Sequence, residues 1–137
     1  MSDTERNLQT IQTIYAAFAR GDVPAILELC SEDAVFGFEG GSPLVPWHGP
    51  WRGRAEIARF FETIGKAVEF QAFEPRHFLA STSEVAVLLR LRYVVAATRN
   101  VVDEQQVHWW SLQSGKVKAL CHHEDTAQVI AAVQPAR

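Results

Sequence analysis

The sequence predicts an α+β fold in which helices come first and long strands follow. Apolar residues recur at helical spacing up to residue 64, whereas from residue 68 onward they alternate at the two-residue period of strands. The strand-like runs follow one another closely, which favours antiparallel pairing between them. We therefore expect one strongly curved antiparallel or mixed sheet packed against three N-terminal helices.

Three helices are expected in the first half of the chain. Ser2 and Glu5 have the spacing of a capping box, and the apolar stripe that follows them ends at Gly21. Asp22 can cap a second helix, which packs antiparallel to the first. The third helix is expected from Arg54 to Ile64 and carries one apolar stripe, so it should cover the sheet.

The strands are separated by one irregular segment. A short apolar run at residues 34–38 precedes the loop GGSPLVPWHGPWRG, residues 40–53, whose glycines and prolines exclude a regular helix or a central strand. After the third helix, four long strands are expected, at Glu69–Leu79, residues 85–95, Val101–Leu112 and Val117–Asp125.

Composition limits the class of protein. A chain of 137 residues with 47% hydrophobic content fits a single domain, residues 1–137, with one core. Its net charge of −3 comes from interspersed acids and bases, which argues against nucleic acid or an anionic membrane as a partner. The N-terminus has no basic region followed by an apolar core, and no apolar window is long enough for a membrane span. A cytoplasmic protein with two reduced cysteines, Cys30 and Cys121, is expected.

The last hairpin contains most of the candidate site residues. Two strand-like runs meet at Ser114-Gly115 and bring together histidines, tryptophans and the acids of the HHED segment. With a plain two-residue turn, one face carries His108, Trp110, His123 and Asp125. With a one-residue shift from a bulge at Gly115, that face carries His108, Trp110, Leu120, His122 and Glu124. In either register, one histidine and one acid accompany His108, a combination that sets the tautomer and pKa of an imidazole.

Several segments in this order resemble the nuclear transport factor two-like superfamily, in its SnoaL-like and ketosteroid-isomerase-like branch. They are AAFARGDVPAILELCSEDAVF, PWHGPWRGRAEIARFF, FEP and SGKVKALCHHEDTA, which together cover nearly the whole chain. The resemblance implies a cone-shaped barrel whose curved sheet and helices enclose an apolar pocket, usually in a homodimer. It also favours the second hairpin register. The superfamily contains isomerases, cyclases, dehydratases, epoxide hydrolases and noncatalytic binders, so the fold alone does not define the chemistry.

The steroid isomerase mechanism does not carry over to this sequence. Where those enzymes have a tyrosine and a general-base aspartate, this chain has Ile14 and Phe38, neither of which can transfer a proton. Tyr15 is displaced by one residue, about 100° around the helix. The position of the third isomerase residue, a late-strand aspartate, falls on His108, which can exchange a proton near neutral pH in its ordinary state.

These observations define the expected site. The catalytic candidates are His108, His122 and Glu124, with the acid orienting one ring while the other transfers the proton. The expected ligand-binding residues are Tyr15, Phe36, Phe38, Trp47, Phe61, Trp110, Leu120 and Asp125. Two histidines and a carboxylate could also form an open zinc site, but HxH and HExxH spacings are absent, so no metal is expected. Dinucleotide and phosphate-binding motifs are also absent, so no cofactor is expected.

Two functions fit the sequence. The first is a small enzyme, a cofactor-independent isomerase, cyclase, dehydratase or lyase that uses pocket histidines as acid-base groups on a small apolar organic ligand. The alternative is a noncatalytic ligand-binding or accessory protein of the same fold. An enzyme needs a cavity histidine with a shifted pKa and a partner acid, whereas a binder needs only shape and apolar area.

Overall fold

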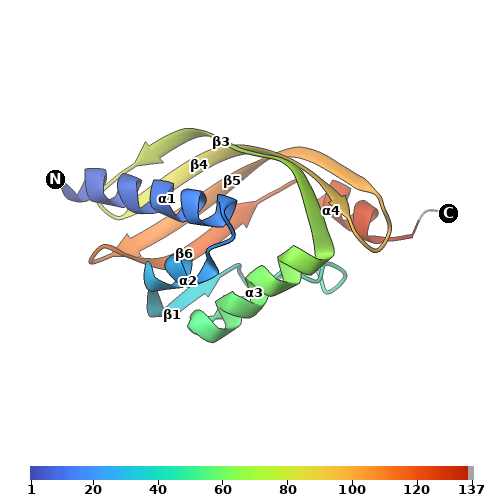
Figure 1. Cartoon of the computed structure of the whole chain (residues 1–137), viewed down its shortest axis with the longest axis horizontal. Coiled ribbons are helices and arrows are strands. Elements are labelled where there is room, and N and C mark those ends of the chain that lie inside the picture. The colour runs from blue at the N-terminus through green and yellow to red at the C-terminus, as the bar shows by residue number, and fades with distance from the viewer. Residues whose placement is uncertain (136–137) are drawn as a thin grey trace.

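The computed structural model describes residues 1–135, which form a curved sheet packed with helices. The strands have the order β2-β1-β6-β5-β4-β3, and β1 and β6 are parallel while the other neighbours are antiparallel. Their bounds are β1 (Cys30–Phe36), β2 (Trp51–Arg52), β3 (Val68–Ala80), β4 (Glu84–Val95), β5 (Val101–Gln113) and β6 (Lys116–His123). The predicted α+β fold and curved mixed sheet are confirmed, although the sheet stays open and does not close into a barrel (Figure 1).

The helices lie on one side and at one end of this sheet. The three expected helices are α1 (Asp3–Ala19), α2 (Val23–Glu28) and α3 (Gly53–Ala67), which lie beneath the arch of the sheet in Figure 1. The side-chain oxygens of Ser2 and Asp22 accept backbone N–H groups at the starts of α1 and α2, as expected for caps. None of the helices in residues 1–135 has both the length and the apolar content that a membrane span requires.

A fourth helix corrects the sequence prediction for the C-terminal segment. The expected last strand reached Asp125, but β6 ends at His123 and α4 (Thr126–Val133) follows. The Asp125 carboxylate accepts the backbone N–H of Gln128 at 3.2 Å and so caps this helix. The connection between β4 and β5 holds the other end of α4, because Asn100 donates to the carbonyl of Ala132 at 3.1 Å.

The hairpin between β5 and β6 has the second of the two predicted registers. His108 pairs with His122, and Trp110 pairs with Leu120. The turn itself is a plain two-residue turn, since Ser114 and Gly115 have φ of 53° and 76°. The shift comes from Lys118 instead, which is the extra residue between the Leu112–Val117 and Ser111–Ala119 pairs. The bulge was therefore predicted with the right effect but at the wrong residue.

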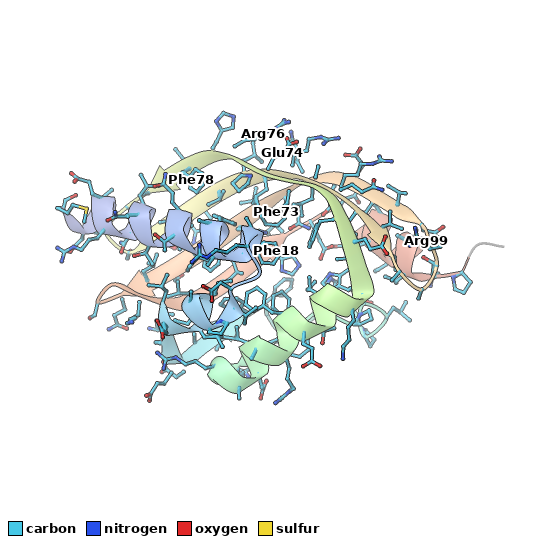
Figure 2. All side chains as sticks on the ribbon, in the orientation of Figure 1. Phe18, Phe73, Glu74, Arg76, Phe78 and Arg99 are labelled. Carbon is cyan, nitrogen blue, oxygen red and sulfur yellow. The ribbon has the colours of Figure 1, made fainter. Side chains whose placement is uncertain are left out.

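The two faces of the sheet differ in character. Figure 2 shows Phe18 of α1 and Phe73 of β3 between the helix and the sheet, and their ring centroids are 4.9 Å apart. Glu74 and Arg76 lie on the outer side, where they form an ion pair at 2.8 Å. The apolar residues of β4 that alternate in the sequence are buried on the inner face. The concave side therefore holds the core and the cavity described next.

Candidate functional site

An inner cavity of about 100 Å³ lies between the concave face of the sheet and the helices. Its wall is mostly aromatic, with a few polar side chains from β5 and β6. Among the residues that line it are eight of the expected site residues: Tyr15, Phe36, Trp47, Phe61, His108, Trp110, Leu120 and His122. An apolar cavity with a few convergent polar groups is the usual form of a small-molecule site.

A chain of hydrogen bonds runs through this wall. The indole N–H of Trp110 donates to the Tyr15 hydroxyl at 3.1 Å, and the Tyr15 oxygen lies 2.7 Å from Nδ1 of His108. Nε2 of His108 lies 3.1 Å from Oε1 of Gln106, whose amide nitrogen donates to Glu104 at 2.6 Å. Each donor has one acceptor if Tyr15 donates to Nδ1 and the Nε2–H of His108 donates to Gln106. The displacement of Tyr15 noted in the sequence therefore does not keep it from the site.

His108 is held as a neutral ring. Burial lowers the pKa of His108 to about 3, with a smaller contribution from the charge of His122. Both ring nitrogens are also occupied, by Tyr15 and Gln106. At neutral pH, His108 can therefore orient its neighbours but is a weak proton acceptor, in contrast to the ordinary imidazole considered from the sequence.

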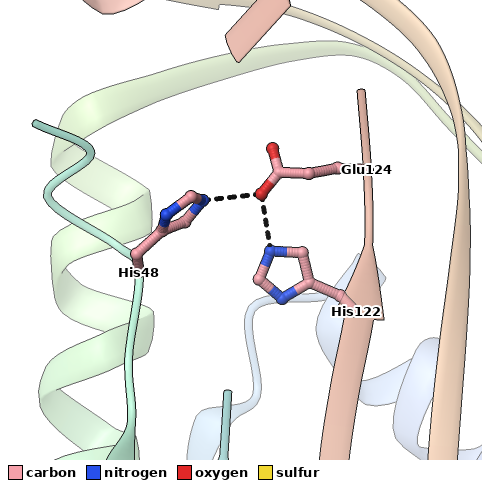
Figure 3. Close-up of side chains that lie close together, drawn as sticks. All are labelled: His48, His122 and Glu124. Carbon is pink, nitrogen blue, oxygen red and sulfur yellow. Dashed lines mark hydrogen bonds and ion pairs between the residues drawn. The ribbon is translucent and has the colours of Figure 1, made fainter. Parts of the chain in front are cut away.

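A second group of side chains meets beside the cavity, where His48 and His122 contact the same carboxylate (Figure 3). Nε2 of His48 lies 2.7 Å from Oε1 of Glu124, and Nε2 of His122 lies 2.9 Å from the same oxygen. Burial alone would raise the pKa of Glu124, but the hydrogen bonds and charges of His122 and His48 hold that pKa below its ordinary value. Glu124 is therefore an ionised acceptor shared by two imidazoles.

Two contacts fix the protons of this triad, which consists of His48, Glu124 and His122. The N–H of Ser42 donates to Nδ1 of His48 at 2.9 Å, so the hydrogen of the neutral His48 ring lies on Nε2 and points at Glu124. His122 likewise donates from Nε2 to Glu124, which leaves its Nδ1 with the lone pair in the neutral ring. The triad thus presents one basic nitrogen, on a residue that lines the inner cavity.

The same three residues could be considered as metal ligands, because their ligand atoms all lie within 4.8 Å of one another. A histidine that binds a metal through Nε2 normally donates its Nδ1–H to an acceptor. Nδ1 of His48 faces a donor instead, the N–H of Ser42. This donor set fits a hydrogen-bonded triad better than a metal centre.

Three expected site residues lie outside the inner cavity. Phe38 is 48% exposed and stacks on His123, with ring centroids 6.5 Å apart. Asp125 is exposed and caps α4, because the chain turns away from the sheet after β6. Glu124 reaches the cavity only through His122. Phe38 and Glu124 line an outer pocket of about 300 Å³, formed by residues of the glycine-rich loop, the HHED segment and Thr126.

Buried polar atoms without hydrogen-bond partners mark the same region. In residues 1–135 they are the Tyr93 hydroxyl, Oε2 of Glu104 and Oε2 of Glu124. Burial raises the pKa of Glu104 to about 7, and the negative charges of Glu124 and Asp125 add to this effect. Burial, together with Glu104 and Glu124, also raises the pKa of Tyr93, so that its hydroxyl stays protonated. Tyr93 lines the inner cavity and has a hydrogen to donate.

Sequence reasoning did not include Tyr93, Gln106 or Glu104 in the site, and it left open whether His48 is a third site histidine or an exposed residue. His48 is 76 residues away from Glu124, and only the folded loop brings them together. Glu104 and Gln106 had a usable signal, since two-residue spacing puts them on the same face of β5 as His108 and Trp110.

The chain is similar to known proteins in both sequence and structure. The sequence model of the SnoaL-like domain family matches residues 11–120. An NTF2-like protein from Burkholderia xenovorans LB400 has 27% identity and a TM-score of 0.85, with coverage of 96% of this chain and 98% of that one. An NTF2-like protein of unknown function from Burkholderia pseudomallei K96243 has 25% identity and a TM-score of 0.85, with coverage of 98% and 99%.

A third structure has the same fold and was crystallised with a small molecule. TerC, co-crystallised with polyporic acid, has 21% identity and a TM-score of 0.82, with coverage of 93% of this chain and 98% of that one. A search of curated proteins finds no match.

Proposed function

We propose that this chain, which belongs to the SnoaL-like domain family, is an enzyme that binds a small, mostly apolar molecule and removes a proton from it without a cofactor. The observation that carries the proposal is the hydrogen bond between Nε2 of His122 and the buried Glu124 carboxylate. Because His122 lines the cavity, its other nitrogen, Nδ1, remains as the base. A carboxylate behind an imidazole orients the ring and stabilises the imidazolium that forms.

The cavity also contains a group suited to the product of that step. Removal of a proton from carbon next to a carbonyl develops negative charge on the carbonyl oxygen, which a hydrogen-bond donor stabilises. Tyr93 lines the cavity, and its hydroxyl is buried and has no partner within residues 1–135. We assign it the role of that donor. Isomerisation, cyclisation and elimination can all begin with this proton transfer, so the proposal covers these three reaction types.

In this proposal the expected catalytic residues divide into two roles. His122 is the base, and Glu124 acts through it as a positioning residue. His108 remains in the site as a neutral ring that holds Tyr15 and Gln106 in place. The remaining aromatic residues supply apolar contact for the ligand.

The proposal includes a homodimer that works in the cytoplasm. The fold shared with TerC, which was co-crystallised with polyporic acid, supports a ligand-binding domain. Native mass spectrometry would report the mass of the assembly together with any retained molecule, and a monomer would contradict the dimer without affecting the site.

A noncatalytic binding protein is the second candidate, and the neutral state of His108 favours it. A ring with a pKa of about 3, enclosed by aromatic side chains, suits retention of a ligand better than turnover. The fold of TerC, which was crystallised with polyporic acid, is compatible with either function.

Deuterium exchange separates the two functions. Cyclohexanone, 2-cyclohexenone and acetophenone would be incubated with the protein in heavy water, and deuterium next to the carbonyl would be followed by NMR. We expect catalysed exchange for a ketone that binds, reduced by at least about 100-fold in His122→Ala. His77→Ala, which removes an exposed histidine from β3, is the matched control and should leave exchange unchanged. Binding of these ketones without catalysed exchange would favour the noncatalytic binder.

A further inference from the structure

The inner cavity and the outer pocket share one lining residue. His122 lines both, and within residues 1–135 it is the only residue that does so. The inner cavity is apolar and aromatic, whereas the outer pocket is lined by polar side chains and by glycines of the loop after β1. A ligand with an apolar part and a polar part could therefore occupy both spaces, on either side of the His122 ring.

Glu124 supplies the outer pocket with an unused acceptor. Its side chain is only 4% exposed, and Oε1 receives both imidazole N–H groups, while Oε2 has no partner in the described chain. A buried carboxylate oxygen without a donor is costly, and a donor supplied by a ligand would remove that cost. Glu124 as a residue lines the outer pocket and not the inner one, and Oε2 itself is buried, so a donor from the outer side must displace neighbouring atoms to reach it.

The charged groups around Glu124 indicate which kind of hydrogen-bond donor can bind its Oε2. The charges of Glu124 and Asp125 both act on Glu104, so three acids lie within electrostatic range of one another. In residues 1–135, the ion pairs of these acids are those of Glu124 with His48 and His122, and none of the three acids pairs with a lysine or arginine. At the same pocket, Phe38 offers an exposed ring, and aromatic faces attract cations. A positively charged donor suits these surroundings better than a neutral one.

We propose that the ligand is amphipathic, with one ring in the inner cavity and a short arm that passes His122 and ends in a protonated amine bound to Oε2 of Glu124. This inference rests on the proposed function for the ring-binding cavity and adds the chemical class of the ligand. The volume of about 100 Å³ sets the size of the apolar part. Because a larger cavity, of about 150 Å³, is known to hold benzene, a single six-membered ring is the upper limit for the apolar part.

Matched ligands test the arm separately from the ring. 2-Phenylethylamine, 3-phenylpropylamine, 2-phenylethanol and ethylbenzene would be titrated against the protein and followed by tryptophan fluorescence, since Trp47 and Trp110 line the cavity. We expect at least one amine to bind about tenfold or more tightly than ethylbenzene, because a hydrogen bond between charged groups is stronger than one between neutral groups. Equal affinity of the alcohol and the amines would overturn the requirement for a cation.

Variants then locate the amine. Glu124→Gln should remove the preference for the amine and leave ethylbenzene binding within about threefold, while Glu74→Gln on the outer face of the sheet should change neither. Thr126→Arg places a competing cation in the outer pocket and should have the same effect as Glu124→Gln, which keeps the test valid if the latter does not fold.

The outcomes separate this inference from the proposed function. If ethylbenzene binds and the amines bind no better, the arm and its site are refuted while the cavity stands. A preference for the amine that persists in both variants also refutes the role of Glu124. Failure of every ring compound to bind would instead contradict the inner cavity as a ligand site, and with it the proposed function.

Discussion

Nε2 of His122 lies 2.9 Å from Oε1 of Glu124, and the same oxygen receives Nε2 of His48 at 2.7 Å. The backbone N–H of Ser42 determines the tautomer of His48, and the contact with Glu124 determines that of His122. The consequence is a single basic nitrogen, Nδ1 of His122. The apolar cavity and this nitrogen together make the protein a candidate for proton transfer on a small ligand.

Tyr15→Phe should destabilise the protein. The variant removes the hydroxyl that joins Trp110 and His108, and it leaves a buried indole N–H and a buried imidazole nitrogen without partners. We expect a loss of about 1–3 kcal/mol in the free energy of unfolding, measured by urea denaturation.

Tyr93→Phe provides the comparison, because it removes a buried hydroxyl that has no partner in residues 1–135. In the absence of ligand, it should change the free energy of unfolding by less than about 0.5 kcal/mol or stabilise the protein. If the proposed donor role is correct, the same variant should slow deuterium exchange of a bound ketone. A larger loss of stability in Tyr93→Phe than in Tyr15→Phe would contradict the hydrogen-bond chain.

Glu104 should make the protein less stable as the pH rises from about 4.5 to about 7. The pKa of Glu104 is raised from 4.5 to about 7 in the folded protein, so the folded state holds an extra proton between these values. Stability must then fall with rising pH across this window and level off above it. The shift corresponds to up to about 3 kcal/mol.

Glu104→Gln tests this dependence. The variant should match the wild type near pH 4.5 and exceed its free energy of unfolding at pH 8, as measured by urea denaturation across the range. Glu32→Gln, which changes an exposed carboxylate, should follow the wild type. Parallel pH profiles for the wild type and Glu104→Gln would show that Glu104 does not carry this proton.

Zinc should not stabilise the protein. Binding through Nε2 of His48 would require a hydrogen on Nδ1, where the N–H of Ser42 already points. Thermal unfolding with equimolar Zn²⁺ should therefore give the same Tm as unfolding with a chelator. A rise of several degrees that disappears in His48→Ala would identify the triad as a metal centre instead.

Much of the fold could be predicted from residue periodicity. The alternation in β4 identified a strand with one buried face, and the Ser2 and Asp22 caps marked the starts of the first two helices. The helix α4 was missed although Asp125 and Gln128 have cap spacing, because the preceding histidines were assigned to one continuous strand. Gly65 was expected to end α3, yet the helix continues to Ala67, since a glycine within a helix weakens it without ending it.

The site was predictable only in part. Periodicity brought His108 and Trp110 to one face, but the choice between His122 and His123 depended on a bulge at Lys118 that no turn residue announces. His48 lies in an irregular loop, where side-chain direction does not follow from spacing. Its role in orienting Glu124 became evident only from the folded structure.

Long-range ¹H–¹⁵N NMR of the histidine rings reports which nitrogen of His122 carries the hydrogen. We expect neutral His122 to carry its hydrogen on Nε2 and to leave Nδ1 unprotonated, with the same tautomer in His48. Glu124→Gln should weaken this preference in His122, because the charged acceptor is gone. A neutral His122 protonated on Nδ1 in the wild type would refute its role as the base, since the cavity would then lack the proposed proton acceptor.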